Sequence, residues 1–331
     1  MQGSSIYSDF SPEISWIGRR IARDVRSFSP SVRPLAGYYT RGRLKVLGGD
    51  IRVTDRRMGR PIPYAVFWFG DALGLEERNL CRLAGLSLVC SSIAITIRDD
   101  MVDARSRNYS GKGRLARFWY KEYFEALRQV YPGREGFTKA ISLADAEWSR
   151  YKRWQSDPSA GWHSRPFSAD FLRESSRYYV TCALPSLTAV AYAAGRREEV
   201  PLISRFLREY SMGWRIFDDL VDWERDIAAN EMNRSSVLIY IRNRMGGKKA
   251  IDRIDALSWF MSDEFVKDAY GAMVGFFMNA RKAVAGLGSR YLDQFMEEQI
   301  RFQTDKRELL LRSAGQARDV LNADLASVLG P

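Results

Sequence analysis

The segment Trp214–Asp226 (WRIFDDLVDWERD) constrains the fold of this chain more than any other stretch. Its aspartates Asp218, Asp222 and Asp226 recur every four residues. Because a helix turns about 100° per residue, these carboxylates drift only about 80° around its surface and form one acidic stripe. Like charges at this spacing repel one another unless a cation lies between them. The spacing therefore predicts a helix whose carboxylates hold a cation.

A second acidic cluster, DDMVD at 99–103, follows a long apolar run and repeats this spacing with Asp99 and Asp103. Two acidic stripes, each at the end of an apolar helix, predict facing metal ligands. The competing interpretation is an ordinary solvated helix face, which a single short motif would not exclude.

Helical periodicity continues through most of the chain. Helices are predicted at about 12–25, 76–103, 111–130, 136–155, 167–194, 198–228, 234–245, 262–285, 289–312 and 315–329. Strand signals are almost absent, although the aromatic run 64–69 (YAVFWF) fits a helix or a strand. No repeat or change in composition marks a domain boundary. The economical interpretation is an all-α protein with one large antiparallel helical bundle over residues 1–331, of which 1–10 are loose.

Composition excludes several classes of protein. Hydrophobic residues make up 46% and aromatic residues 13%, which indicates a folded globular chain. The start of the sequence does not resemble a secretory signal, and the apolar run 83–97 is shorter than the roughly 20 residues that cross a bilayer. We therefore expect a cytoplasmic protein without a transmembrane segment.

Cys81, Cys90 and Cys182 lie in apolar surroundings and are predicted to be buried thiols. The single His163 excludes most histidine-based chemistry.

The formal charge of +11 raises the question of a nucleic-acid partner. Lysine and arginine are spread along the chain and no nucleic-acid motif accompanies them, so no such partner is predicted. The densest basic segment, 41–60, fits either a place near a phosphate-bearing ligand or an anionic membrane surface, or a solvated loop. Pro185 lies within the predicted helix 167–194 and should kink it. The carbonyl groups freed there could serve a functional cavity or belong to a tolerated kink.

The two motifs carry a resemblance. GWRIFDDLVD at 213–222, together with DDMVD at 99–103, resembles the class I isoprenoid synthase superfamily of prenyl diphosphate synthases and terpene cyclases. Weaker similarities are SVRPLAGYYT at 31–40 and VTCAL at 180–184. The resemblance implies a helical bundle around a central active-site cavity, a linear prenyl diphosphate as substrate, and three Mg²⁺ ions. It also allows a homodimer.

The resemblance further implies roles for individual residues. The Mg²⁺ ligands would be Asp99, Asp103, Asp218, Asp222 and Asp226. Arg290 and Tyr291 resemble the arginine–tyrosine pair with which cyclases grip diphosphate, and Arg173 lies at about the distance of their diphosphate-sensing arginine. Arg177 is a rival for that second role. A carbocation would be stabilised by aromatic faces, for which the candidates, each of which fits the core equally well, are Phe67, Trp68, Trp214, Phe217, Phe276 and Phe277.

Several residues depart from the prenyl synthase pattern, and these departures favour the terpene cyclases within the superfamily. Of the basic residues that hold isopentenyl diphosphate in the synthases, only Arg33 remains in the first element. Ser91 stands at the histidine position and Val180 at the lysine position. The resemblance therefore implies a Mg²⁺-dependent terpene synthase that ionises farnesyl or geranylgeranyl diphosphate and cyclises or rearranges the cation. The alternative is a trans-prenyl diphosphate synthase; a silent subunit of an active synthase and a nucleic-acid-binding helical protein are less favoured.

Overall fold

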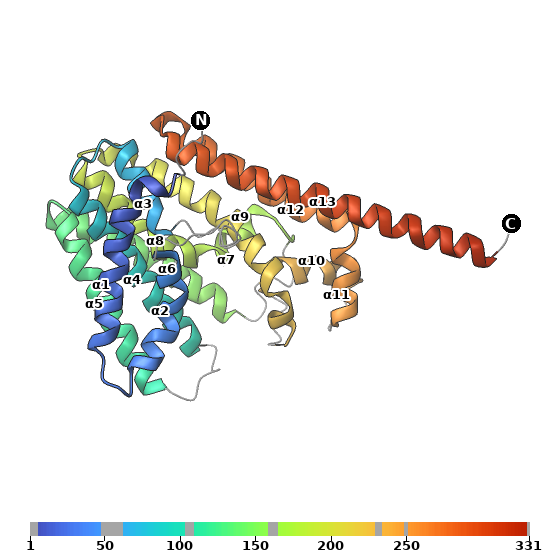
Figure 1. The fold of residues 1–331 in the computed structure, drawn as a ribbon, viewed down its shortest axis with the longest axis horizontal. Coiled ribbons are helices and arrows are strands. Elements are labelled where there is room, and N and C mark those ends of the chain that lie inside the picture. Colours follow the sequence, from blue (N-terminus) through green and yellow to red (C-terminus); the bar gives the residue numbers. More distant parts are fainter. Residues whose placement is uncertain are drawn as a thin grey trace. The chain divides into compact units, whose positions relative to one another are not determined.

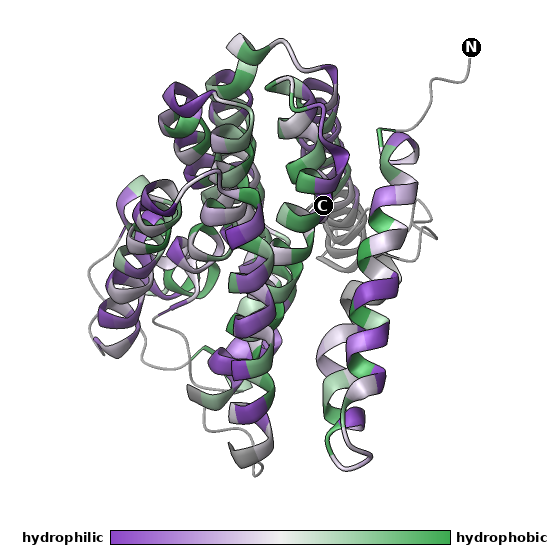
Figure 2. Cartoon of the chain, turned by 90° about the vertical axis from the view of Figure 1, so that its left-hand side faces the viewer, coloured by the Kyte–Doolittle hydropathy of each residue, from purple (hydrophilic) through white to green (hydrophobic). Residues whose placement is uncertain are grey.

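The computed structural model describes residues 6–47, 62–102, 109–157, 165–228, 234–247 and 251–329. These residues form thirteen α-helices and no strand, which confirms the predicted all-α class (Figure 1). In Figure 2 most helices carry both hydrophobic and hydrophilic residues, as expected where one side of a helix is buried.

Most of the predicted helices are present with boundaries shifted by a few residues. The helices of the first half are α1 (Ser11–Ser27), α2 (Arg33–Leu47), α3 (Ile62–Ala72), α4 (Arg78–Val102), α5 (Tyr109–Val130) and α6 (Arg134–Ser156). Those of the second half are α7 (Ala169–Ser175), α8 (Arg177–Ala193), α9 (Val200–Ala228), α10 (Ser236–Arg244), α11 (Arg253–Phe260), α12 (Asp263–Val284) and α13 (Arg290–Leu329). Short 3₁₀ helices lie at Ser8–Phe10 (η1), Arg197–Glu199 (η3) and Ala285–Leu287 (η4).

The chain divides into two compact units. Unit 1 comprises 1–147, 179–207 and 283–295, and unit 2 comprises 148–178, 208–282 and 296–331. The division falls inside α6, α8, α9, α12 and α13, so each of these helices contributes residues to both units. A single domain over the whole chain stays a prediction.

Unit 1 is built around α4, which packs most extensively against α5 and also contacts α1, α2 and α3. The ambiguous run 64–69 is helical in α3 and is buried on all sides, which explains why its pattern shows no helical periodicity. Trp68 packs on Phe295, with 4.8 Å between ring centroids. Gly85 of α4 allows the close approach of α1, since a Cβ there would lie 2.7 Å from Ile17 Cδ1.

Within the described residues, one helical stretch, Arg78–Met101 of α4, is long and apolar enough to cross a bilayer. Its most apolar part is 78% buried inside the protein. A core helix has the same length and composition, and α4 is packed as one.

Pro185 lies inside α8, which continues past it to Ala193. The carbonyl oxygen of Cys182 accepts a hydrogen bond from the Ser91 hydroxyl at 2.8 Å, and that of Pro185 accepts one from the Tyr131 hydroxyl at 3.0 Å. Side chains of unit 1 therefore bind two carbonyl groups close to the proline. All three cysteines are free and buried, as predicted.

In unit 2, Gly213 allows α9 to lie close to α12. A Cβ at this position would lie 2.8 Å from Phe277 Cε1 and 3.2 Å from the carbonyl oxygen of Met273. A methyl group there would displace a buried ring and crowd backbone.

We therefore expect Gly213→Ala to lower the free energy of unfolding by about 1–3 kcal/mol, because overpacking forces neighbours out of place. Chemical denaturation followed by circular dichroism measures this change. Gly275→Ala is the matched control, since nothing lies within 4 Å of its Cβ position in α12 and alanine favours a helix. A neutral Gly213→Ala variant would contradict the close packing of α9 on α12.

Candidate functional site

The acidic stripe, defined as Asp218, Asp222 and Asp226, lies on α9 as the sequence predicts. The helix is continuous from Val200 to Ala228, so the three residues follow one another at successive turns. Asp218 and Asp222 are half-buried and Asp226 is buried. Asp222 also accepts a 2.6 Å ion-pair contact from Arg225 of the same helix. The three carboxylates thus lie on one side of α9, and the third is buried more deeply than the first two.

Asp219, next to the stripe, has a different environment. It is 2% exposed, and its Oδ2 accepts hydrogen bonds from the backbone N–H of Ser236 at 2.7 Å and from the Ser236 hydroxyl at 2.6 Å. Its Oδ1 lies 2.9 Å from the guanidinium of Arg215. Burial raises the pKa of Asp219 to about 6, against the opposing effects of Arg215 and Ser236. These bonds attach the first turn of α10 to α9, so Asp219 has a structural role.

The first motif lies at the end of α4 in unit 1. Asp99 and Asp100 are half-buried there, and Asp103 lies outside the described residues. Asp100 Oδ2 accepts a 2.6 Å hydrogen bond from the Tyr39 hydroxyl and lies 3.5 Å from the ammonium group of Lys112. Lys112 is only 6% exposed and stands 5.6 Å above the Tyr39 ring. Burial, with the hydrogen bond to Asp100, raises the pKa of Tyr39 well above its usual value.

The second aspartate is held in the same manner in both motifs. A hydroxyl group and a cation contact each carboxylate: Tyr39 and Lys112 at Asp100, Ser236 and Arg215 at Asp219. Sequence reasoning missed Tyr39, Lys112 and Ser236, because their partners are distant in sequence and no spacing connects them. The first and fifth positions of each motif remain the metal-binding candidates by their spacing alone, and one of them, Asp222, pairs with Arg225.

The residues of the two motifs fit Mg²⁺ by their chemistry. Carboxylate oxygens are the ligands that this ion prefers. The described part of the chain contains no group of three or more histidine, cysteine, aspartate or glutamate side chains already gathered for a metal. The predicted ligand set, Asp103 included, and the count of three ions therefore stay predictions.

The structure does not bring Arg290 and Tyr291 to the first motif. Arg290 Nη2 and the Tyr291 hydroxyl lie 3.2 and 2.9 Å from Oδ2 of Asp9. The Tyr291 ring packs on Phe10, which in turn lies 5.4 Å from the guanidinium of Arg78, the first residue of α4. Asp99 is 21 residues further along that helix, which is about 30 Å at 1.5 Å per residue. In unit 1 the pair joins the start of α13 to η1.

The two rival arginines lie in unit 2 and differ in exposure. Arg173 on α7 is half-exposed and contacts Asp170 at 3.1 Å. Arg177, the first residue of α8, is buried and donates to both oxygens of Glu174 at 2.6 and 2.7 Å. These hydrogen bonds lower the pKa of Glu174. Arg173 is thus the more accessible of the two cations, and Arg177 is the more firmly held.

Among the aromatic candidates, Phe67, Trp68 and Phe277 are fully buried and pack as core. Trp214 is buried too, and its ring lies 5.0 Å from that of Phe217, which is half-buried. Trp214 precedes Asp218 by about one helical turn, and Phe217 is its direct neighbour in the sequence. Of the predicted aromatic candidates, these two are the ones that α9 carries beside the stripe.

Comparison with solved structures yields a match over nearly the whole chain. The geranylgeranyl pyrophosphate synthetase from the archaeon Geoglobus acetivorans superposes with a TM-score of 0.66, over 90% of this chain and 99% of that protein, at 17% identity. The chain has the isoprenoid synthase fold. No family model matches the sequence, and no curated protein matches it. At this identity the likeness establishes the fold alone, so the reaction has to be inferred from the residues of the site.

The environment of Asp219 leads to a stability prediction. We expect Asp219→Asn to lower the free energy of unfolding by about 2 kcal/mol, because an amide removes the negative charge that pairs with the half-buried Arg215 and accepts two hydrogen bonds from Ser236. Denaturant unfolding at neutral pH measures the change. Asp145→Asn, at an exposed position on α6, is the control and should change stability by less than about 0.5 kcal/mol. Equal stability of the two variants would contradict the structural role of Asp219.

Proposed function

We propose that this protein is a Mg²⁺-dependent terpene synthase, which ionises farnesyl or geranylgeranyl diphosphate and cyclises or rearranges the resulting cation. The observation that supports the proposal is the acidic stripe on α9, whose three carboxylates follow one another at successive turns of one continuous helix, the spacing that suits metal ions. The neighbouring Asp219 is bound to α10 and so holds this helix in place. The fold, shared with a geranylgeranyl pyrophosphate synthetase, supports a prenyl diphosphate substrate.

In this proposal the metal ligands are Asp99, Asp103, Asp218, Asp222 and Asp226. Bound Mg²⁺ supplies Lewis-acid stabilisation of the leaving diphosphate. Arg173, or its rival Arg177, is the guanidinium group proposed to donate charge-assisted hydrogen bonds to that group. The rings of Trp214 and Phe217 stabilise positive charge on the substrate, since the faces of aromatic rings attract cations.

The choice of a terpene synthase over an elongase depends on the positions where elongases hold a second diphosphate. Ser91 is buried and donates its hydroxyl to Cys182 O, and Val180 is buried as well. The guanidinium of Arg33 donates to the carbonyl oxygen of Phe28 at 3.1 Å. All three side chains are engaged in packing or in local hydrogen bonds. This supports a reaction with one diphosphate substrate.

The alternative is a trans-prenyl diphosphate synthase that condenses an allylic diphosphate with isopentenyl diphosphate. The name of the structural neighbour favours it. In that case the second diphosphate would need cations other than those of the synthase pattern, and Lys112 beside Asp100 is a candidate. A cytoplasmic location and a homodimer are compatible with both reactions and stay predictions.

Product analysis tests the choice. Purified protein is incubated with Mg²⁺ and geranyl, farnesyl or geranylgeranyl diphosphate, each with and without isopentenyl diphosphate, and both phases are analysed by mass spectrometry. We expect a hydrocarbon or alcohol and free diphosphate from farnesyl or geranylgeranyl diphosphate alone. A longer prenyl diphosphate that forms only with isopentenyl diphosphate would contradict the terpene synthase and establish the alternative.

The same assay tests the metal ligands. Asp99→Ala or Asp218→Ala should reduce turnover by at least about a thousandfold, since each removes a ligand of the ions that stabilise the leaving group. EDTA should abolish activity and excess Mg²⁺ should restore it. Asp145→Asn, the exposed control, should retain full activity. Near-normal turnover in Asp99→Ala or Asp218→Ala would contradict the metal assignment.

A further inference from the structure

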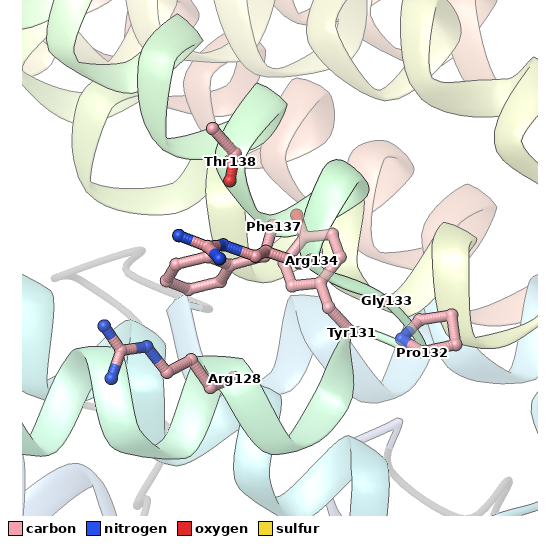
Figure 3. A pocket seen from close by; sticks show the side chains of 7 residues that line it. All are labelled: Arg128, Tyr131, Pro132, Gly133, Arg134, Phe137 and Thr138. Carbon is pink, nitrogen blue, oxygen red and sulfur yellow. The ribbon is translucent and has the colours of Figure 1, made fainter.

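A separate pocket lies where α5 turns into α6. It has a volume of about 530 Å³ and is lined by Arg128, Tyr131, Pro132, Gly133, Arg134, Phe137 and Thr138. In Figure 3 the guanidinium groups of Arg128 and Arg134 lie toward the same side of this pocket, with the ring of Phe137 beside them. Arg128 stands 5.5 Å above that ring. The volume falls within the range of small-molecule sites.

The charge of the pocket is strongly positive. Neither Arg128 nor Arg134 forms an ion pair with a carboxylate in the part of the chain that the structure describes. Of the neighbouring acidic residues, Glu125 pairs with Lys121, and Glu135 does not line the pocket. Arg134 is also the first residue of α6, where the helix dipole adds positive potential. Two guanidinium groups that line one pocket repel each other, and an anion bound between them offsets that repulsion.

Contacts with α8 fix the backbone around the pocket. Tyr131 at its floor is buried, and its hydroxyl bonds to Pro185 O at 3.0 Å and to the Thr188 hydroxyl at 2.9 Å. Gly136 brings α6 so close to α8 that a Cβ there would lie 2.6 Å from the Tyr192 ring. The arginine side chains thus extend from a backbone whose position is set by the core of unit 1.

The pocket is distinct from the first aspartate motif. Lys112 lies beside Asp100, and Arg128 is 16 residues further along the same helix. At 1.5 Å per residue this is about 24 Å. A ligand in the pocket would therefore not contact Asp99 or Asp100.

We propose that this pocket binds the phosphate group of a small organic phosphate. The two arginines hold the phosphate oxygens, the Thr138 hydroxyl donates a further hydrogen bond, and the organic part packs against Phe137. Arginine suits this role because its planar guanidinium pairs with phosphate in a bidentate manner. The site is independent of Mg²⁺ and of the reaction proposed above.

Isothermal titration calorimetry in EDTA tests the proposal, because chelation removes metal-dependent binding at the aspartate motifs. The probes are phenyl phosphate and inorganic phosphate. We expect phenyl phosphate to bind, and Arg128→Ala/Arg134→Ala to weaken it by about tenfold or more, as the loss of hydrogen bonds to a charged group implies. Tighter binding of phenyl than of inorganic phosphate indicates an organic ligand; equal binding indicates the free anion.

The control variant, Arg26→Ala/Arg205→Ala, removes the same charge from exposed arginines of α1 and α9 outside the pocket and should bind as the wild type does. Thr138→Glu is a second test that leaves both arginines in place: a carboxylate at this exposed position should repel the ligand and abolish binding. Absence of binding to the wild type, or equal affinity in wild type, the double arginine variant and Thr138→Glu, would overturn the proposal.

Discussion

The buried carboxylate of Asp219 is the interaction on which the second motif depends. A carboxylate without partners is costly to bury, so this residue requires the cation of Arg215 and both donors of Ser236. Those bonds fix the register of α9 against α10. They thereby hold α9 in one rotational orientation, and with it the side of the helix that carries Asp218, Asp222 and Asp226. Asp100 plays the corresponding part in unit 1, with Tyr39 and Lys112 as its partners.

The proposed function assigns two roles, structural support and metal binding, to adjacent aspartates of each motif. Neighbouring positions on a helix point about 100° apart, so one aspartate can face the protein while its neighbour faces outward. In the proposed function, the buried Asp219 orients α9, and the metal ligands are the other aspartates of the motif. Like charges at this spacing repel one another, and the proposed Mg²⁺ would offset that repulsion.

The sequence predicts the all-α class and most helices, because the apolar period of a helix is a local property. It also predicts the stripe on α9, since spacing alone defines it. It does not reveal α11, whose pattern is short and whose Ile254 is largely exposed, or the continuity of α13 through the break expected near residue 313. The contacts of Arg290 and Tyr291 with Asp9 connect opposite ends of the chain. Spacing from Asp218 could not indicate them.

The most direct test of the central claim is the location of the metal. Crystals grown with Mn²⁺, which shares the oxygen preference of Mg²⁺, and with inorganic diphosphate would show the ions by anomalous scattering. The account predicts peaks coordinated by Asp99 and Asp103 and by the acidic stripe, with Asp219 still bound to Ser236 and Asp100 to Tyr39. Peaks coordinated by Asp100 or Asp219, or none at either motif, would contradict it.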